Sequence, residues 1–136
     1  MVTELADDDA ESVVALWITS ELTRPWNDPL ADFRRAMDGA TSTVLGIKDE
    51  DRVIGTVMVG NDGHRGWMYY VAVSPAHRRA GLGRLLVDAA EAWLRESGAI
   101  KVQLMVRSEN DAAMEFYRAA GYERGEVEVL SRWIEK

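Results

Sequence analysis

The feature that most constrains this chain is a turn rich in glycine and arginine between two regular elements. It carries the pattern Arg-x-x-Gly-x-Gly at 78–83, inside a stretch, 77–84, that holds three arginines and one histidine. The apolar run 67–73 before it is typical of a central strand buried on both faces. An amphipathic segment follows, so backbone N–H groups and the positive end of a helix dipole would meet at the turn. We therefore expect a phosphate-binding loop in an α/β fold.

The helix after the turn is the best defined in the sequence. It stops at Gly98, a common residue just past a helix end, and a further apolar strand is expected at 100–106. A strand, a helix and a second strand in this order predict a crossover unit in which 67–73 and 100–106 are parallel neighbours. The apolar stripe expected to cover the sheet consists of Leu82, Leu85, Leu86, Ala89, Trp93 and Leu94.

The remaining elements follow from apolar periodicity and from capping residues. Asp7 to Asp9 offer N-caps for a first helix, and Asp28 with Pro29 begins a second helix that ends near Gly39. Asn110 can cap a helix that reaches Ala120. The complete set of further expected elements is a strand at 2–5, a helix at 9–22, hairpin strands at 43–48 and 52–60, and a last strand at 126–134.

Composition limits the class of protein. A chain of 136 residues predicts one domain, 1–136, and an ordinary globular core at 47% apolar and 29% charged residues. There is no run of about 18 apolar residues and the start is acidic, so we expect a cytoplasmic protein without membrane segments. With no cysteine and only two histidines, no metal site is expected. A net charge of −7 argues against nucleic-acid binding.

Two familiar phosphate-binding patterns do not match the turn. A Rossmann fingerprint requires a third glycine where Leu86 stands, and an acidic residue about twenty positions later. A P-loop requires a Gly-Lys-Ser/Thr ending, which the sequence lacks. NAD and ATP are therefore disfavoured ligands, and a nucleotide-phosphate-binding protein remains the weakest of the open alternatives.

At these residues the chain resembles the GNAT N-acetyltransferases. Residues 70–83, which read Tyr-Val-Ala-Val-Ser-Pro-Ala-His-Arg-Arg-Ala-Gly-Leu-Gly, look like the family's acetyl-CoA motif, and 110–122 are similar to its second motif. Segments 22–29 and 63–66 further look like the YpeA-like bacterial branch. The resemblance implies a GNAT-like α/β fold with a mixed sheet of about six to seven strands and about four helices.

The resemblance also implies how acetyl-CoA is bound. Backbone amides after Arg78 would hold the pyrophosphate, and backbone groups at the end of the strand 67–73 would pair with the pantetheine arm. The cofactor-binding residues implied in this way are Val71, Ala72, Val73, Arg78, Arg79, Ala80, Gly81, Leu82, Gly83, Arg84, Asn110 and Tyr117. Without the resemblance, the arginines could form a solvated helix start, although basic residues there oppose the helix dipole unless an anion is bound.

For catalysis the resemblance implies direct attack of an amine on the thioester in a ternary complex, with Tyr117 as the general acid that protonates the departing thiolate. On pattern alone Tyr117 would be a core aromatic. The strand 67–73 carries no carboxylate where many family members have a glutamate, so the general base stays open between Asp62, His64 and Glu109.

The acceptor is expected to be a primary amine of a small molecule, a peptide or protein N-terminus, or a lysine. Trp26, Asp62 and His64 are the expected substrate-binding residues. A non-catalytic acyl-CoA-binding regulatory module remains the alternative function. Alternate apolar residues in 126–134 are compatible with pairing to a second copy in a homodimer.

Overall fold

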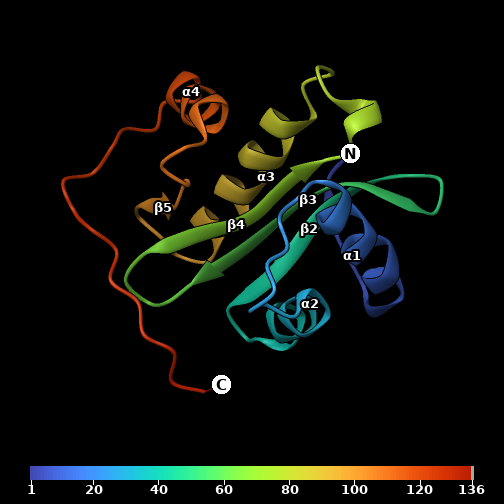
Figure 1. Ribbon diagram of the computed structural model, residues 1–136, viewed down its shortest axis with the longest axis horizontal. Coiled ribbons are helices and arrows are strands. Elements are labelled where there is room, and N and C mark those ends of the chain that lie inside the picture. The colour runs from blue at the N-terminus through green and yellow to red at the C-terminus, as the bar shows by residue number, and fades with distance from the viewer. Residues whose placement is uncertain (136) are drawn as a thin grey trace. The chain divides into compact units, whose positions relative to one another are not determined.

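This computed structural model, which describes residues 1–135, contains a five-stranded sheet in the order β1-β2-β3-β4-β5 (Figure 1). Neighbouring strands are antiparallel except β4 and β5, which are parallel as expected for the crossover. The chain divides into two units, Met1–Met105 with the whole sheet and a second unit from Val106 onward. The strands are β1 (Thr3–Glu4), β2 (Ser42–Asp49), β3 (Arg52–Asn61), β4 (Gly66–Val73) and β5 (Val102–Leu104).

Four α-helices are present in the described chain, as predicted: α1 (Ala10–Thr19), α2 (Pro29–Asp38), α3 (Leu82–Glu96) and α4 (Asp111–Ala119). The start of α2 confirms the expected cap, because the Asp28 side chain accepts hydrogen bonds from the N–H groups of Leu30 and Ala31 at 3.1 and 3.2 Å. None of the helices within residues 1–135 has the length and apolar character needed to cross a bilayer.

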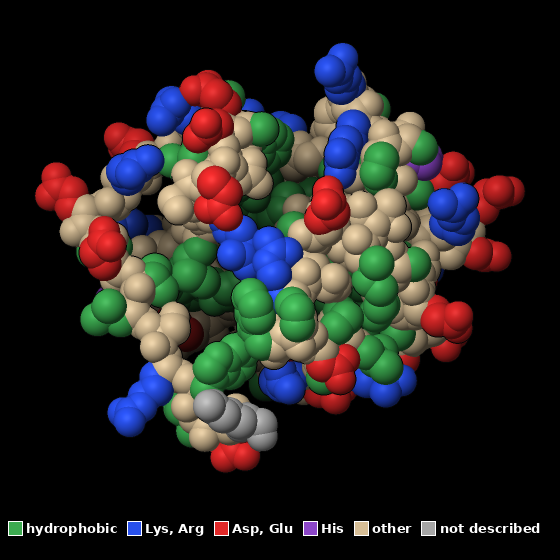
Figure 2. Space-filling model, viewed as in Figure 1, with side chains coloured by type: hydrophobic (Ala, Val, Ile, Leu, Met, Phe, Trp, Pro, Cys, Tyr) green, Lys and Arg blue, Asp and Glu red, His purple; other side chains and the backbone are tan. Residues whose placement is uncertain are grey.

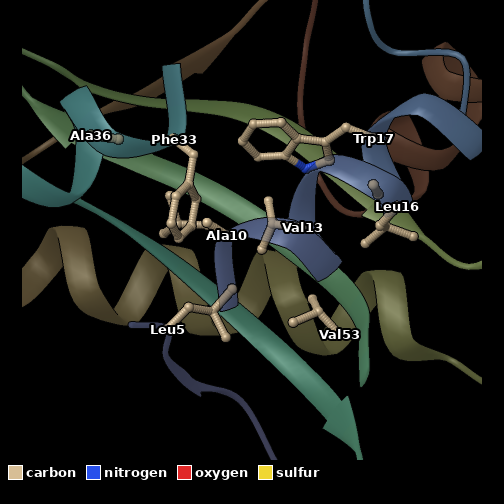
Figure 3. Packing of buried hydrophobic residues seen from close by; sticks show 10 residues of the cluster. Leu5, Ala10, Val13, Leu16, Trp17, Phe33, Ala36 and Val53 are labelled. Atoms are coloured by element: carbon tan, nitrogen blue, oxygen red, sulfur yellow. The ribbon is translucent and has the colours of Figure 1, made fainter. Parts of the chain in front are cut away.

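In the first unit, α1 and α2 cover one face of the sheet and α3 covers the other (Figure 1). On the first face, the fully buried ring of Trp17 meets Phe33 edge-on at 6.4 Å between centroids (Figure 3). On the second face, α3 buries Leu86, Val87, Ala90 and Leu94. The expected stripe was partly wrong, since Leu85 is 48% exposed; the helix is rotated so that Val87 and Ala90 face the sheet instead.

β4 contains a bulge that changes its relation to β3. The register passes from the Thr56–Ala72 pair to the Met58–Tyr69 pair, so two residues of β4 lie opposite the single residue between them on β3. The first of the two, Tyr70, has a φ of 51°, a left-handed conformation that is unusual for a residue with a large side chain. The Thr56 hydroxyl donates to the Tyr70 carbonyl at 2.9 Å and holds the bulge in place.

The expectation that β4 is buried on both faces was wrong. Met68 is 2% exposed, but Tyr69 is 40% exposed. The physical reason is that Met68 faces α3, whereas Tyr69 points to the opposite face, where α1 and α2 pack more on β2 and β3 than on β4. The apolar run that suggested a central strand therefore includes one aromatic residue, Tyr69, that faces outward.

The first helix also differs from its expected limits of 9–22. A short 3-10 turn occupies Asp7–Asp9, and the α-helix ends at Thr19. Asp9 is buried instead of solvated, and its carboxylate accepts from the Ala6 N–H at 2.8 Å and pairs with Lys48 Nζ at 2.8 Å. The carboxylate thus connects the chain before α1 with β2, and it does not cap α1.

The predicted strand at 126–134 is not formed, and the sheet has five strands, not six to seven. The side chains of Val127, Val129 and Trp133 are 74%, 62% and 56% exposed. Alternation predicts a strand only where another strand supplies hydrogen bonds, and in the described part of the chain this segment pairs with no strand.

Candidate functional site

The turn before α3 exposes backbone N–H groups. Arg79 and Gly81 both have positive φ values, 69° and 78°, which reverse the chain just before the helix. At the start of α3 the Leu85 N–H donates to the Gly81 carbonyl at 3.2 Å, and among residues 1–135 no side chain caps this helix. The amides of 82–84 therefore point out of the helix start, as an anion would require.

The basic side chains near this turn have different roles. Arg78 Nε donates to the Val73 carbonyl at 3.2 Å, so this side chain folds back onto the end of β4. Arg84 pairs with Asp88 at 3.2 Å on the helix surface, a geometry worth little in water. His77 does not add to the cluster as its position suggested, because Nε2 faces Asp49 at 3.7 Å. Figure 2 shows Lys and Arg side chains projecting over the turn, at the top of the view.

The outer edge of β4 is open beside the turn. Pairing with β5 covers only Gly66–Met68, which leaves Tyr69–Val73 without a strand neighbour on this edge within the described chain. The Ser74 N–H donates to a β3 carbonyl at 2.8 Å and so points toward β3. Because backbone groups of successive strand residues alternate between the two edges, those of Val73 face the open edge. Val71 belongs to the bulge and follows the last residue of β4 that pairs with β5 by three positions. Ala72, between them, is buried and pairs with β3.

The Tyr70 side chain lies on the face covered by α1 and α2. Its ring stacks on Trp17 with centroids 3.7 Å apart and planes 11° from parallel, and its hydroxyl donates to Asp32 Oδ2 at 2.8 Å. Burial, followed by the hydrogen bond to Asp32 and the charge of Asp32, raises the pKa of Tyr70. Sequence reasoning missed Asp32, because a single acid in a helix without a motif gives no local signal of a contact with β4.

Asp62 organises the turn between β3 and β4. Its Oδ1 accepts from the N–H groups of His64 and Arg65 at 2.8 and 2.7 Å, and its Oδ2 accepts from Trp67 Nε1 at 3.2 Å. The hydrogen bonds from the backbone of Arg65 and His64 are the main reason why the pKa of Asp62 is lowered. A carboxylate held in this way is a poor proton acceptor. His64 lies exposed in the same turn, and Trp26 is 59% exposed in the loop before α2.

In the second unit, Asn110 caps α4, since its side-chain oxygen accepts from the Ala113 N–H at 3.0 Å. Tyr117 lies on α4 with its ring 5.0 Å from Phe116 and 5.8 Å from Tyr122, both edge-on. Burial raises the pKa of Tyr117 to about 12. Glu109 is exposed, with its carboxylate 3.4 Å from the Ser108 hydroxyl.

A pocket of about 150 Å³ lies at the far end of α3 from the turn, and it contains none of the predicted site residues. It is lined by Glu91, Arg95, Ala99, Ile100, Lys101 and Val102. Within residues 1–135, no three acidic, histidine or cysteine side chains are grouped as metal ligands would be.

Comparison with solved structures shows a shared fold. The aminoglycoside acetyltransferase AAC(6')-Iy, in complex with the bisubstrate analogue CoA-S-monomethyl-acetylneamine, matches with a TM-score of 0.83 at 16% identity, over 98% of this chain and 97% of that one. A transcriptional regulator from Bacillus halodurans C-125 matches with a TM-score of 0.84 at 18% identity, over 98% and 99%. The ribosomal-protein-S18-alanine N-acetyltransferase from Escherichia coli matches with a TM-score of 0.79 at 20% identity, over 92% and 78%.

The sequence itself identifies the family. A model of the Acetyltransferase (GNAT) family matches residues 8–122, which include the turn before α3, the open edge of β4 and the whole of α4. The match spans most of the chain and both of its units. On this evidence the chain belongs to the GNAT acetyltransferase family.

Proposed function

We propose that this protein transfers an acetyl group from acetyl-CoA to a primary amine. The observation that carries the proposal is the set of uncapped amides at the start of α3, placed next to the open edge of β4. Such an arrangement suits a ligand that combines a pyrophosphate with a strand-like arm. Structures related in fold support it, because the aminoglycoside acetyltransferase AAC(6')-Iy forms complexes with CoA and with a CoA bisubstrate analogue.

In this proposal the pyrophosphate accepts hydrogen bonds from the turn and the first turn of α3. The residues present fit such a group: a Cβ added at Gly81 would meet no atom within 4 Å, so the space beside the turn is open. The proposed contacts with acetyl-CoA are those of Val71, Ala72, Val73, Arg78, Arg79, Ala80, Gly81, Leu82, Gly83 and Arg84. Arg78 would act mainly by fixing the turn, through its bond to Val73.

The proposed chemistry is a direct transfer. The amine nitrogen attacks the thioester carbonyl carbon and forms a C–N bond, the nitrogen loses a proton to the base, and the C–S bond breaks. The thiolate receives a proton from Tyr117, which regains one from solvent before the next cycle. A phenol with a pKa of about 12 is protonated at neutral pH and can serve as that acid. Asn110 would contribute by capping the helix that carries Tyr117. The proposal treats 1–136 as one acetyltransferase domain.

The acceptor is proposed to be an amine of a small molecule or of a peptide or protein, and the subgroup to be the YpeA-like branch. Trp26, Asp62 and His64 would shape the acceptor side of the protein. Asp62 would do so by organising its turn and not as the base, because its oxygens are already hydrogen-bonded. His64 and Glu109 remain candidates for the base, as does water.

Two measurements test the proposal. Acetyl-CoA and CoA should raise the thermal midpoint, while ATP and NAD should not, because only a ligand of the native state stabilises it. CoA release should then exceed background with at least one member of a panel of polyamines, aminoglycosides, amino acids and N-terminal peptides.

The alternative is a non-catalytic acyl-CoA-binding regulator. The similar structure of a transcriptional regulator from Bacillus halodurans C-125 favours this second candidate. Stabilisation by acetyl-CoA without release of CoA from any amine would favour the regulator. Stabilisation by ATP or NAD instead of CoA would refute both readings.

A further inference from the structure

We propose that Asp32 and Tyr70 receive the positively charged acceptor amine, with Asp32 as the residue that positions the Tyr70 hydroxyl. This inference rests on the proposed function, and it concerns the acceptor half of the reaction, for which the sequence predicts Trp26, Asp62 and His64 but not this pair. The motivating observation is a hydrogen bond of 2.8 Å from the Tyr70 hydroxyl on β4 to Asp32 Oδ2 on α2.

The direction of this hydrogen bond decides what Tyr70 can do. A phenol has one proton to donate and two lone pairs to accept with. Because the proton is directed to Asp32, the Tyr70 oxygen can interact with an N–H group only as an acceptor, through its lone pairs. The nearby negative charge of Asp32 makes that oxygen a better acceptor and attracts an ammonium group.

The position of Tyr70 is fixed by its surroundings. Its ring lies 3.7 Å from the fully buried Trp17, and its carbonyl accepts from the Thr56 hydroxyl at 2.9 Å. Pairing of β4 with β5 ends at Met68, so Tyr70 lies in the part of β4 whose outer edge has no strand neighbour in the described chain. A ligand on that edge would therefore have the Tyr70 residue beside it.

Asp32 can accept a new cation. Its side chain is 25% exposed, and its ion-pair partner in the described chain is Arg35, 3.2 Å away with a side chain that is 75% exposed. An exposed pair of this kind is weak, so an ammonium ion can replace or share it at little cost. Asp62 is less suited, because its two oxygens accept three hydrogen bonds within its own turn.

Two indole N–H groups give separate reporters for these carboxylates. Trp17 Nε1 donates to Thr56, which holds the Tyr70 carbonyl, so its NMR signal reports on Tyr70. Trp67 Nε1 donates to Asp62 and reports on that turn. The probe is 1,5-diaminopentane, titrated at millimolar concentration into the 15N-labelled, CoA-saturated protein. The control probe is 1,5-pentanediol, which has the same length and no charge.

We expect the diamine, and not the diol, to shift the Trp17 indole signal. Asp32→Asn should weaken the diamine affinity about tenfold or more, and Asp32→Glu should restore part of the affinity. Arg35→Ala should raise the affinity about two- to threefold, because the competing ion pair that it removes is exposed and weak. Asp38→Asn, on the same helix with an exposed side chain, should change nothing. Each variant's 1H–15N spectrum shows whether it is folded. If Asp32→Asn does not fold, the change in diamine affinity caused by Arg35→Ala still tests the proposal.

The proposal is overturned if the wild-type Trp17 signal does not move with the diamine, if only the Trp67 signal moves, or if Asp32→Asn binds as well as wild type. Failure of the proposed function would look different. Diamine binding that depends on Asp32, without CoA release from any amine, would refute the proposed transfer reaction but support amine binding by Asp32 and Tyr70. CoA release with an unchanged amine KM in Asp32→Asn would support the transfer reaction but refute amine binding by Asp32 and Tyr70.

Discussion

Thr56 makes two hydrogen bonds with one fully buried hydroxyl group. It accepts from the Trp17 indole N–H and donates to the Tyr70 carbonyl, both at 2.9 Å. At the scale of single residues, this hydroxyl connects the core of the first unit with the bulge in β4. No substitute of similar shape without a hydroxyl can satisfy both partners.

Thr56→Val should therefore lower the free energy of unfolding by about 1–3 kcal/mol, since it leaves the indole N–H and a carbonyl group without a buried partner. Urea unfolding followed by circular dichroism measures the change. Thr41→Val, at an exposed side chain, is the control and should stay within about 0.5 kcal/mol of wild type. Equal stability of both variants would show that the two bonds contribute nothing.

Tyr117→Phe should reduce kcat about tenfold or more and leave the affinity for acetyl-CoA nearly unchanged, because it removes only the donated proton. Burial raises the pKa of Tyr117 to about 12, so the wild-type phenol keeps its proton throughout the range from pH 7 to 10. A kcat profile over that range should show no loss of activity due to Tyr117. A full-rate Phe variant would end its assignment as the acid.

At the scale of elements, the start of α3 depends on the left-handed residue Gly81. Gly81→Val should weaken CoA binding and lower stability by about 1–2 kcal/mol, because a β-branched residue strains this conformation. Isothermal titration with CoA and thermal unfolding measure the two effects. Gly125→Ala is the matched control, since a Cβ there would make only one ordinary contact, with Val127 at 3.7 Å. Unchanged CoA affinity in Gly81→Val would argue against a site at this turn.

Much at this scale was predictable from sequence, and the misses have physical causes. The α2 cap, the hairpin and the parallel crossover follow from local signals at Asp28 and Gly98 and from apolar runs. The rotation of α3 could not be predicted, because apolar periodicity marks both Leu85 and Ala90 as possible core residues. Only packing against the sheet decides that Ala90 is buried and Leu85 is exposed. The Asp32–Tyr70 contact joins residues 38 positions apart, and no local pattern encodes it.

At the scale of the whole molecule, residues 127–134 carry several exposed apolar side chains in a segment without helix or strand. We predict that they mediate a homodimer, since such a segment gains both hydrogen bonds and apolar contacts by adding to a sheet edge of a second copy. Sedimentation velocity should show a dimer for wild type and a monomer for the Val129→Asp, Trp133→Asp double variant. Glu128→Gln is the control. A wild-type monomer, or a dimer that survives both changes, would contradict this prediction.

The bulge in β4 changes which residues of the strand face α3, from even-numbered positions before it to odd-numbered positions after it. Gly66 and Val73 both face α3: a Cβ on Gly66 would touch Leu94, and Val73 lies opposite Gly55, whose Cβ would touch Leu86. An even and an odd position can share one face only because the inserted residue inverts the parity of the strand midway. Deleting one residue at 70 or 71 would restore a single parity, and the remaining side chains of β4, up to Val73, would be presented to the wrong face of the sheet.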